Sequence, residues 1–198
     1  TLFLFHGTGG DENQFLGLGE QLLPDARLVA PRGDVSEGGA LRYFKRTGEG
    51  RYDMADLERA TAKTAAFVTA QKGDGPAVGF GYSNGANIIA SVLFEQPEAF
   101  DRAVLLHPLI PFEPAPQPGL AGKPVLIEIP MADSLEESEE ICRVQEETGV
   151  LAMAGQVRRF NPSHQWIKNK IDAGELKVQQ MDVQTYFFRR SNMNAKGE

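Results

Sequence analysis

The 198-residue sequence has little cysteine, little histidine and no long apolar run. The single cysteine, Cys142, excludes an internal disulfide and has no ligand-like spacing to other residues, so we expect it to be a small core residue. No apolar stretch approaches the roughly 18 residues that a membrane-spanning helix needs, and no charged-then-apolar leader precedes Thr1. Because the chain opens directly on a strand of buried type, we expect the first strands of the domain to be missing.

The charges argue against several kinds of partner. The net charge is −7, and acidic and basic residues are interspersed, without the basic patch that a nucleic-acid-binding protein needs. The densest acidic run, residues 136–140, begins an expected helix, where carboxylates favour the helix dipole and a solvated first turn. We therefore expect a cytoplasmic protein with no metal, no cofactor, no nucleic acid and no membrane span. Its expected partner is a small-molecule ester. Whether the protein forms a homodimer stays open.

Short apolar strands alternate with helices along most of the chain. Hydrophobic residues make up 41% of the sequence and charged residues 24%, as in ordinary globular proteins. The expected strands cover residues 1–5, 28–30, 77–81, 103–107, 124–129, 150–154 and 178–188. The expected helices cover residues 53–72, 86–94, 134–148 and 162–173. The alternation predicts an α/β fold with a mostly parallel sheet and helices on both faces, while the Gly-rich, charged residues 32–52 indicate a long surface loop.

The segment Gly81-Tyr82-Ser83-Asn84-Gly85 lies between an expected strand and an expected helix. Its two glycines let the backbone turn so sharply that the serine side chain stands exposed above the edge of the sheet. This turn, a nucleophile elbow, strains the backbone of the serine itself. A plain Gly-rich turn has the same pattern, but the flanking strand and helix favour the elbow, with Ser83 as the nucleophile.

The segment His6-Gly7-Thr8-Gly9-Gly10 follows the first strand directly. Acyl transfer needs two N–H donors aimed at the oxygen that becomes negative in the tetrahedral intermediate. One donor usually belongs to the residue after the nucleophile, here Asn84, and the other to a Gly-rich loop after an earlier strand. We therefore expect an oxyanion hole made by the amides of Thr8 and Asn84. The alternative is a flexible turn between a strand and a helix.

Three segments, residues 6–13, 79–87 and 105–108, are together specific for one family. Through them, residues 1–127 resemble the α/β-hydrolases of the phospholipase/carboxylesterase family. This resemblance implies a Ser–His–Asp esterase with an α/β-hydrolase-like core. In such an enzyme Ser83 attacks the substrate, while Asn84 and the Thr8 region hold the oxyanion.

The later part of the chain is similar to a different family. The likeness rests on residues 128–130, 147–149, 155–162 and 186–190. Through them, residues 128–198 resemble the Gfo/Idh/MocA dehydrogenases, and especially the 4-carboxy-2-hydroxymuconate-6-semialdehyde dehydrogenases. The Gly-x-Gly-x-x-Gly phosphate loop of that family is absent, so dinucleotide affinity should be poor.

The two resemblances together predict a chimera with its seam near residues 123–130. We expect a hydrolase-like core over residues 1–127 and a dehydrogenase-like segment over residues 128–198 that completes, or is appended to, the same sheet. Splicing at this place preserves strand–helix–strand connectivity, because both families lead here into a late parallel strand and then a helix.

The remaining members of a catalytic triad must come from few candidates. The hydrolase family places an acid after the late strand and a histidine after the next one, and Asp133 and His164 occupy these places without the family's Gly-Gly-His turn. Asp133 is otherwise a loop residue before a helix cap, and His164 a solvent-facing helix residue. With only three histidines in the chain, the base is His164, His107 or His6. We predict His164 as base, Asp133 as the residue that orients it, and His6 and His107 as substrate-binding residues.

These observations predict a serine hydrolase of the carboxylesterase or phospholipase type, which cleaves a small carboxylic ester through an acyl-enzyme. Two alternatives stay open: a fragment of an NAD(P)-dependent semialdehyde dehydrogenase, and an inactive hybrid of the two families.

Overall fold

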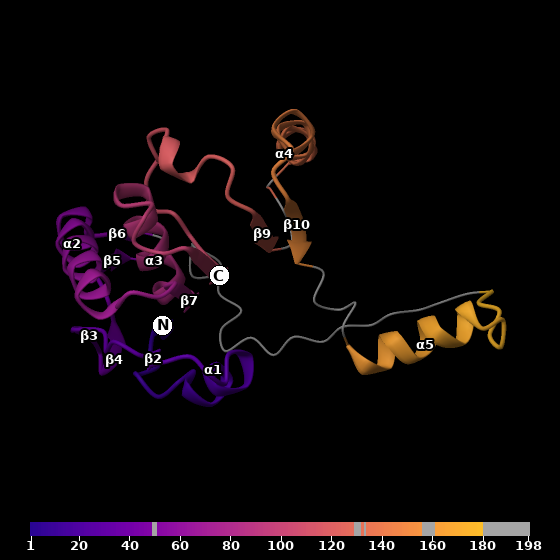
Figure 1. Ribbon diagram of the computed structural model, residues 1–198, viewed down its shortest axis with the longest axis horizontal. Coiled ribbons are helices and arrows are strands. Elements are labelled where there is room, and N and C mark those ends of the chain that lie inside the picture. The colour runs from indigo at the N-terminus through magenta and orange to yellow at the C-terminus, as the bar shows by residue number, and fades with distance from the viewer. Residues whose placement is uncertain (49–50, 129–131, 133, 156–160, 180–198) are drawn as a thin grey trace, which may run out of the picture. The chain divides into compact units, whose positions relative to one another are not determined.

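The computed structural model describes residues 1–48, 51–128, 132, 134–155 and 161–179. The chain forms two units, Thr1–Gly155 and Gln156–Glu198, and Figure 1 shows the elements of each. The first unit contains all of the strands described below, and the described residues of the second unit contain one helix.

A four-stranded parallel sheet forms the centre of the first unit. Its strands are β1 (Leu2–Phe5), β2 (Leu28–Val29), β7 (Val78–Tyr82) and β8 (Arg102–Leu106). The order is β2-β1-β7-β8, with every neighbouring pair parallel. Phe5 lies opposite Gly81, and Tyr82 lies opposite Leu106. The loops that follow β1, β7 and β8 therefore leave the sheet side by side at its carboxyl edge, where open α/β sheets bind their ligands.

Helices cover both faces of this sheet. The helices are α1 (Leu16–Leu22), α2 (Met54–Gln71) and α3 (Asn84–Glu95). In β1, Phe3 and Phe5 point to one face and pack in the core that contains α2 and α3, while Leu2 and Leu4 point to the other face with residues of α1. This alternation is the period-two pattern of a strand that is buried on both sides. The predicted α/β fold with a parallel sheet and helices on both faces is confirmed.

Residues 32–52 were predicted to be a long surface loop, but they form two antiparallel hairpins. The strands are β3 (Val35–Glu37), β4 (Ala40–Arg42), β5 (Arg46–Gly48) and β6 (Arg51–Tyr52). Gly38 and Gly39 both have positive φ and join β3 to β4 in a two-residue turn, as glycines do in tight hairpins. The hairpins are not peripheral, because Arg42, Tyr43 and Phe44 are all buried.

A strand–helix–strand segment follows the main sheet. It consists of β9 (Val125–Glu128), α4 (Leu135–Thr148) and β10 (Ala152–Gly155), after a short 3-10 turn at Pro118–Leu120. β9 and β10 pair in parallel and form their own two-stranded sheet. The expectation that residues 128–198 complete, or are appended to, the main sheet stays a prediction.

Both ends of α4 are capped, whereas its cysteine does not lie in a core as the sequence predicts. The hydroxyl of Ser134 accepts a hydrogen bond from the N–H of Glu137, and Gly149 ends the helix in the left-handed region. The prediction that Cys142 is a core residue is wrong, because no residue of α4 is buried and Cys142 is exposed.

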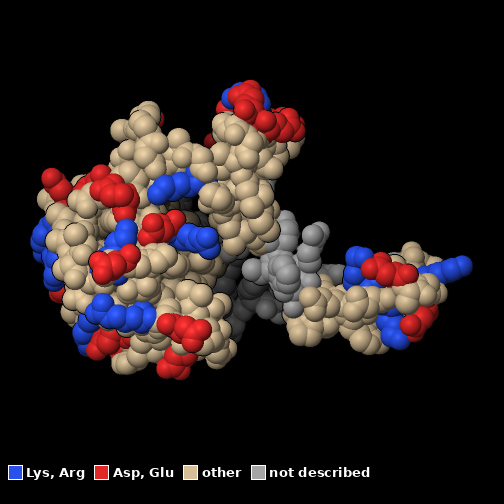
Figure 2. Space-filling view, viewed as in Figure 1, with Lys and Arg blue, Asp and Glu red and all other residues tan. Residues whose placement is uncertain are grey.

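The second unit contributes α5 (Pro162–Asp172), which begins at a proline and carries Asn161 as its N-cap. Most of the strand expected at residues 178–188 lies outside the described residues. Among the helices that the structure describes, none is long and apolar enough to cross a membrane. Figure 2 shows acidic and basic side chains interspersed over the visible surface of the first unit, in agreement with the interspersed charges of the sequence.

Candidate active site

Ser83 lies at the turn from β7 to α3 in a strained backbone conformation. Its φ is 51° and its ψ is −115°, and a serine in such a region costs on the order of 1–3 kcal/mol. The Ser83 N–H donates to the carbonyl of Leu106 at 2.8 Å, and the Ser83 carbonyl accepts from the N–H of Asn87 at 2.9 Å. The strain is thus maintained by bonds to both β8 and α3.

The two glycines of the elbow are required by close backbone contacts. A Cβ added to Gly81 would lie 2.6 Å from the carbonyl oxygen of Gly85. A Cβ added to Gly85 would lie 2.3 Å from the carbonyl oxygen of Phe5 and 2.6 Å from that of His6. Since backbone atoms cannot yield as a flexible side chain can, only glycine fits at either position. The same contacts press the start of α3 against the end of β1.

In the loop after β1, the three glycine amides on either side of Thr8 are hydrogen-bonded. Gly7 N–H donates to the side-chain oxygen of Gln14 (2.9 Å), Gly9 N–H to the carbonyl of Leu41 (3.1 Å), and Gly10 N–H to the carbonyl of Gly7 (3.0 Å). In the part of the chain that the structure describes, no hydrogen bond is formed by the N–H of Thr8, which lies between these residues.

The backbone N–H of Asn84 likewise has no acceptor among the described residues. As the first residue of α3, it has no acceptor within its helix, and no other acceptor for its amide occurs among the described residues. Its side chain is buried, with Oδ1 accepting from the N–H of Tyr43 at 2.7 Å. The amides of Thr8 and Asn84 therefore follow adjacent parallel strands, and neither has an acceptor in the part of the chain that the structure describes.

His6 is the histidine with the most contacts. Its side chain is 1% exposed, Nδ1 is 2.8 Å from the carbonyl of Gly7, and Nε2 accepts from the N–H of Gly33 at 2.9 Å. An imidazole that accepts at Nε2 carries its proton on Nδ1, so these two bonds fit the neutral ring. His6 is predicted to bind substrate, but both of its ring nitrogens already have hydrogen-bond partners within the chain. Through these bonds the ring connects the loop after β1 to Gly33.

His107 stands next to Ser83 at the carboxyl edge. Tyr82 and Leu106 are register partners, so the following residues, Ser83 and His107, leave neighbouring strands together. Both have a φ of 51°, and among the described residues they are the only non-glycines with positive φ. His107 is exposed, with its ring edge-on to that of Tyr82 at 5.6 Å between centroids.

The other two predicted triad members lie elsewhere in the chain. His164 is exposed and lies in the first turn of α5, in the second unit. Asp133 lies outside the described residues. The structure thus brings Ser83, Thr8, Asn84 and His107 to one edge of the sheet, and it does not test the roles of His164 and Asp133.

Sequence reasoning missed the residues that support this edge from the β3–β4 hairpin. The side chain of Arg42 is 4% exposed, and its Nη1 donates to the hydroxyl of Thr8 at 2.9 Å. Burial lowers the pKa of this guanidinium, as does the nearby charge of Arg46, while Glu37 acts against both. Burial also raises the pKa of the Tyr43 hydroxyl, which donates to the carbonyl of Pro31 at 2.8 Å. The Glu-Gly-Gly-Ala turn signal could have indicated the hairpin, but not the contacts of its side chains.

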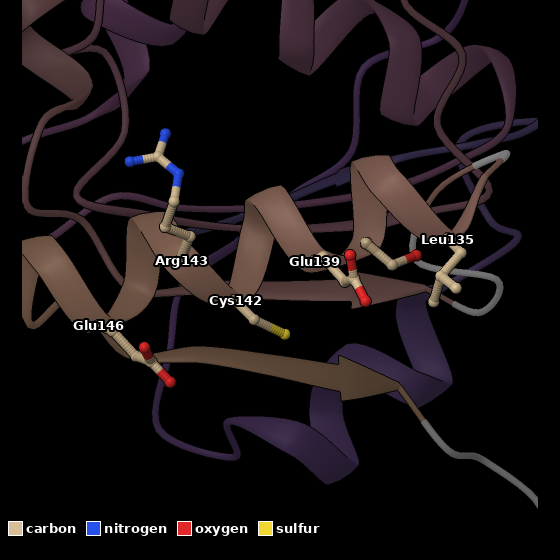
Figure 3. Close-up of a pocket in the computed structure, with 6 residues that line it drawn as sticks. Leu135, Glu139, Cys142, Arg143 and Glu146 are labelled. Carbon is tan, nitrogen blue, oxygen red and sulfur yellow. The ribbon is translucent and has the colours of Figure 1, made fainter.

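Two other features do not belong to this site. Figure 3 shows a shallow hollow on α4, lined by side chains from one face of that single helix. Its lining residues are Leu135, Ser138, Glu139, Cys142, Arg143 and Glu146. Among the described residues there is also no group of three or more histidine, cysteine, aspartate or glutamate side chains that could hold a metal ion.

The chain is similar to hydrolases over most of its length. It is 42% identical over 160 residues to the putative hydrolase MhqD of Bacillus subtilis, covering 77% of this chain and 80% of that protein. The crystal structure of the Bacillus cereus carboxylesterase superimposes with a TM-score of 0.66 at 34% identity, covering 85% of this chain and 87% of that one.

A shorter similarity connects the chain to dehydrogenases. Residues 162–198 match the family of bacterial oxidoreductases, C-terminal. A stretch of 78 residues is 65% identical to the 4-carboxy-2-hydroxymuconate-6-semialdehyde dehydrogenase of a Sphingobium species. That stretch covers 39% of this chain but only 25% of the dehydrogenase. The resemblance of the chain to two families is therefore confirmed.

Proposed function

The chain belongs to the family of α/β-hydrolases that includes MhqD and the bacterial carboxylesterases, and we propose that it is a serine hydrolase cleaving a small carboxylic ester. The observation that carries this proposal is the strained Ser83 at the same sheet edge as the backbone amides of Thr8 and Asn84, which have no acceptor among the described residues. A nucleophile and a pair of N–H donors at one edge are what acyl transfer requires.

The reaction proceeds through an acyl-enzyme. A base takes the proton of the Ser83 hydroxyl as its oxygen attacks the ester carbonyl, and the N–H groups of Thr8 and Asn84 stabilise the negative oxygen. The protonated base then gives its proton to the leaving alcohol, which departs as the ester bond breaks. Water, activated by the same base, attacks the acyl-enzyme and releases the acid and Ser83.

For the base we propose His164, oriented by Asp133, on the basis of their order in the sequence. We propose that His107 lines the substrate site, because it leaves the sheet beside Ser83 and exposes its ring. His6 is less suited to contact substrate, since both of its ring nitrogens have partners in the chain. A cytoplasmic location, and a homodimer as an open alternative, stay predictions from the sequence.

Removal of the nucleophile tests the proposal most directly. Ser83→Ala should abolish hydrolysis of p-nitrophenyl acetate and labelling by a fluorophosphonate, with little change in thermal stability. Ser83→Gly should be equally inactive but more stable, by about 1 kcal/mol, because glycine relieves the positive φ. Both can be followed by turnover, by mass spectrometry of the labelled protein and by thermal melting. Turnover retained in Ser83→Ala would rule out the proposed serine hydrolase.

The choice of base is tested by comparing two histidines. His164→Ala should lower kcat by on the order of 10³-fold or more, as the loss of a triad base does, and Asp133→Asn should lower it less. Adding Ser83→Ala to His164→Ala should cause little further loss. His107→Ala should mainly raise KM. If His107→Ala is as inactive as Ser83→Ala while His164→Ala keeps its rate, the base is His107 and the assignment of His164 is wrong.

A further inference from the structure

Three consecutive residues of the β3–β4 hairpin hold both sides of the proposed oxyanion hole. The carbonyl of Leu41 accepts from the N–H of Gly9 at 3.1 Å. The Nη1 of Arg42 donates to the hydroxyl of Thr8 at 2.9 Å. The N–H of Tyr43 donates to Oδ1 of Asn84 at 2.7 Å. One short segment therefore contacts both Thr8 and Asn84, the residues of the proposed oxyanion hole.

The central contact uses a buried cation. The side chain of Arg42 is 4% exposed, and its Nε donates to the carbonyl of Phe44 at 3.2 Å. Its acidic neighbour, Glu37, is 3.7 Å from Nε but lies closer to Arg46, at 2.8 Å. Burying a guanidinium is costly unless its donors are used. The Arg42 charge is thus only partly balanced by Glu37, and one of its donors is directed to Thr8.

The backbone of Arg42 is fixed as firmly as its side chain. A Cβ added to Gly33 would lie 2.4 Å from the carbonyl oxygen of Arg42, so that strand β4 is in close contact with this glycine. The N–H of Gly33 in turn donates to Nε2 of His6 at 2.9 Å. The backbone that carries the Arg42 side chain is therefore held close to Gly33 and, through Gly33, to His6.

We propose that Arg42 is a positioning residue, which holds Thr8 so that its free N–H faces the developing oxyanion at Ser83. This inference rests on the proposed serine hydrolase. A donor helps only when it is preorganised at the place where the negative charge develops. The hydrogen bond to the Thr8 hydroxyl restrains the residue that carries the donor, and the nearby positive charge favours a negative oxygen there.

The decisive variant leaves the buried arginine in place. Thr8→Val keeps the shape of the side chain and the backbone N–H but removes the hydroxyl that Arg42 holds. Because Thr8 is exposed, the fold should tolerate it. We expect kcat on p-nitrophenyl acetate to fall about tenfold with little change in KM, as expected for a contact that matters in the transition state. Thr8→Ser, which restores the hydroxyl, should recover most of that loss.

The arginine itself is tested with a charge-matched control. Arg42→Met should lower kcat at least as much as Thr8→Val does. Adding Thr8→Val to Arg42→Met should cause little further loss of kcat, because both variants remove the same hydrogen bond between Arg42 and Thr8. Arg32→Met removes the same charge from a surface pair with Glu12 and should leave kcat unchanged. Melting curves of every variant show whether an inactive protein is still folded.

The possible outcomes distinguish a failure of the positioning role of Arg42 from a failure of the proposed serine hydrolase. An inactive Ser83→Ala with a fully active Thr8→Val overturns the positioning role of Arg42 and leaves the serine hydrolase standing. An effect of Thr8→Val on KM alone also overturns it. A parent protein that shows neither turnover nor fluorophosphonate labelling at Ser83 overturns the proposed function, and this inference with it.

Discussion

At the scale of the residue, glycine and serine create the candidate site through backbone geometry. Ser83 is held at a φ that costs free energy, and the glycines on either side are needed because backbone atoms occupy the space of a side chain. The Gly-x-Ser-x-Gly pattern was enough to predict the turn, because only glycine can occupy positions where a side chain would collide with the backbone. The role of Arg42 could not be predicted, because the identity of its partner Thr8 depends on folding across 34 positions.

Replacing an elbow glycine should therefore be far more damaging than replacing a free one. Gly85→Ala places a Cβ 2.3 Å from a backbone oxygen of β1, and we expect a loss of roughly 2–3 kcal/mol in the free energy of unfolding, as in overpacked cores. Gly17→Ala, in α1, has nothing within 4 Å of its new Cβ and should gain about 0.5 kcal/mol. Urea unfolding of both variants measures the difference, and equal stabilities would contradict this account of the elbow.

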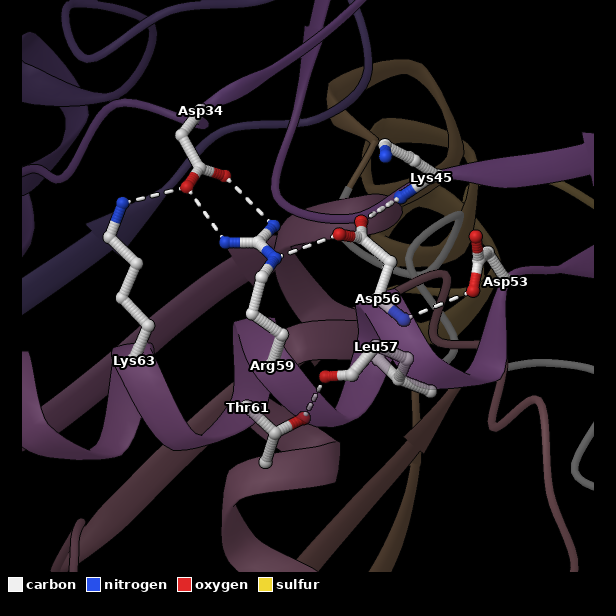
Figure 4. A network of polar contacts seen from close by, with 8 residues as sticks. All are labelled: Asp34, Lys45, Asp53, Asp56, Leu57, Arg59, Thr61 and Lys63. Carbon is white, nitrogen blue, oxygen red and sulfur yellow. Dashed lines mark hydrogen bonds and ion pairs between the residues drawn. The ribbon is translucent and has the colours of Figure 1, made fainter.

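At the scale of the element, α2 holds the hairpins through a polar network. Figure 4 shows Arg59 of α2 between two carboxylates, those of Asp34 and Asp56, with Lys63 also on Asp34. Asp56 accepts from the N–H of Lys45 at 2.8 Å, which ties the strand after Tyr43 to the helix. This helix was predicted at residues 53–72, because helical periodicity is a local pattern. The hairpins were not, because strands of two or three residues carry too little periodicity.

This network should make stability depend on pH. Burial alone would raise the pKa of the Asp56 carboxyl, but hydrogen bonds from Arg59 and from the N–H of Lys45 outweigh it and hold the pKa below the ordinary 3.8. A lowered folded-state pKa stabilises the protein above the unfolded-state pKa, and this contribution is lost as the pH falls through the folded-state value. Asp56→Asn should thus be less stable than the parent at pH 7, by thermal melting, and the gap should narrow below about pH 4.

A constant gap between Asp56→Asn and the parent across that pH range would show that the charge of Asp56 is not what stabilises the hairpins. The matched control is Asp172→Asn, whose carboxylate pairs with Lys168 on the exposed face of α5. Exposed pairs contribute little, so this variant should melt like the parent at both pH values.

At the scale of the whole molecule, the chain joins parts of two enzyme families. The hydrolase similarity covers most of the chain, whereas the chain spans only 25% of the length of the matching dehydrogenase. Both resemblances could be read from local motifs in the sequence. How the hydrolase-like and dehydrogenase-like parts pack together could not be predicted, because that packing depends on contacts between residues far apart in the sequence. We keep the division at residues 127 and 128 as a proposal about sequence origin, distinct from the two units of the structure, which divide after Gly155.

The dehydrogenase part should not bring dinucleotide binding with it. A dinucleotide-binding glycine loop leaves space where side chains are missing, so that the pyrophosphate can approach the backbone. In β7 and at the start of α3 that space is already filled: an added Cβ on Gly79 would lie 3.1 Å from the ring of Phe100, on Gly81 it would meet α3, and on Gly85 it would meet β1. The residues present therefore do not fit a pyrophosphate there.

We accordingly expect no saturable binding of NADH or NADPH at micromolar concentrations. The single tryptophan, Trp166, is 61% exposed on α5 and serves as a donor for fluorescence transfer to the nicotinamide, with isothermal titration as a check that does not depend on its position. Gly79→Ala offers a control, because filling a glycine that cradles a pyrophosphate would abolish binding. Saturation at low micromolar NADH, lost in Gly79→Ala, would instead show that β7 and the turn that follows it accept a dinucleotide, and the dehydrogenase alternative would then outrank the serine hydrolase.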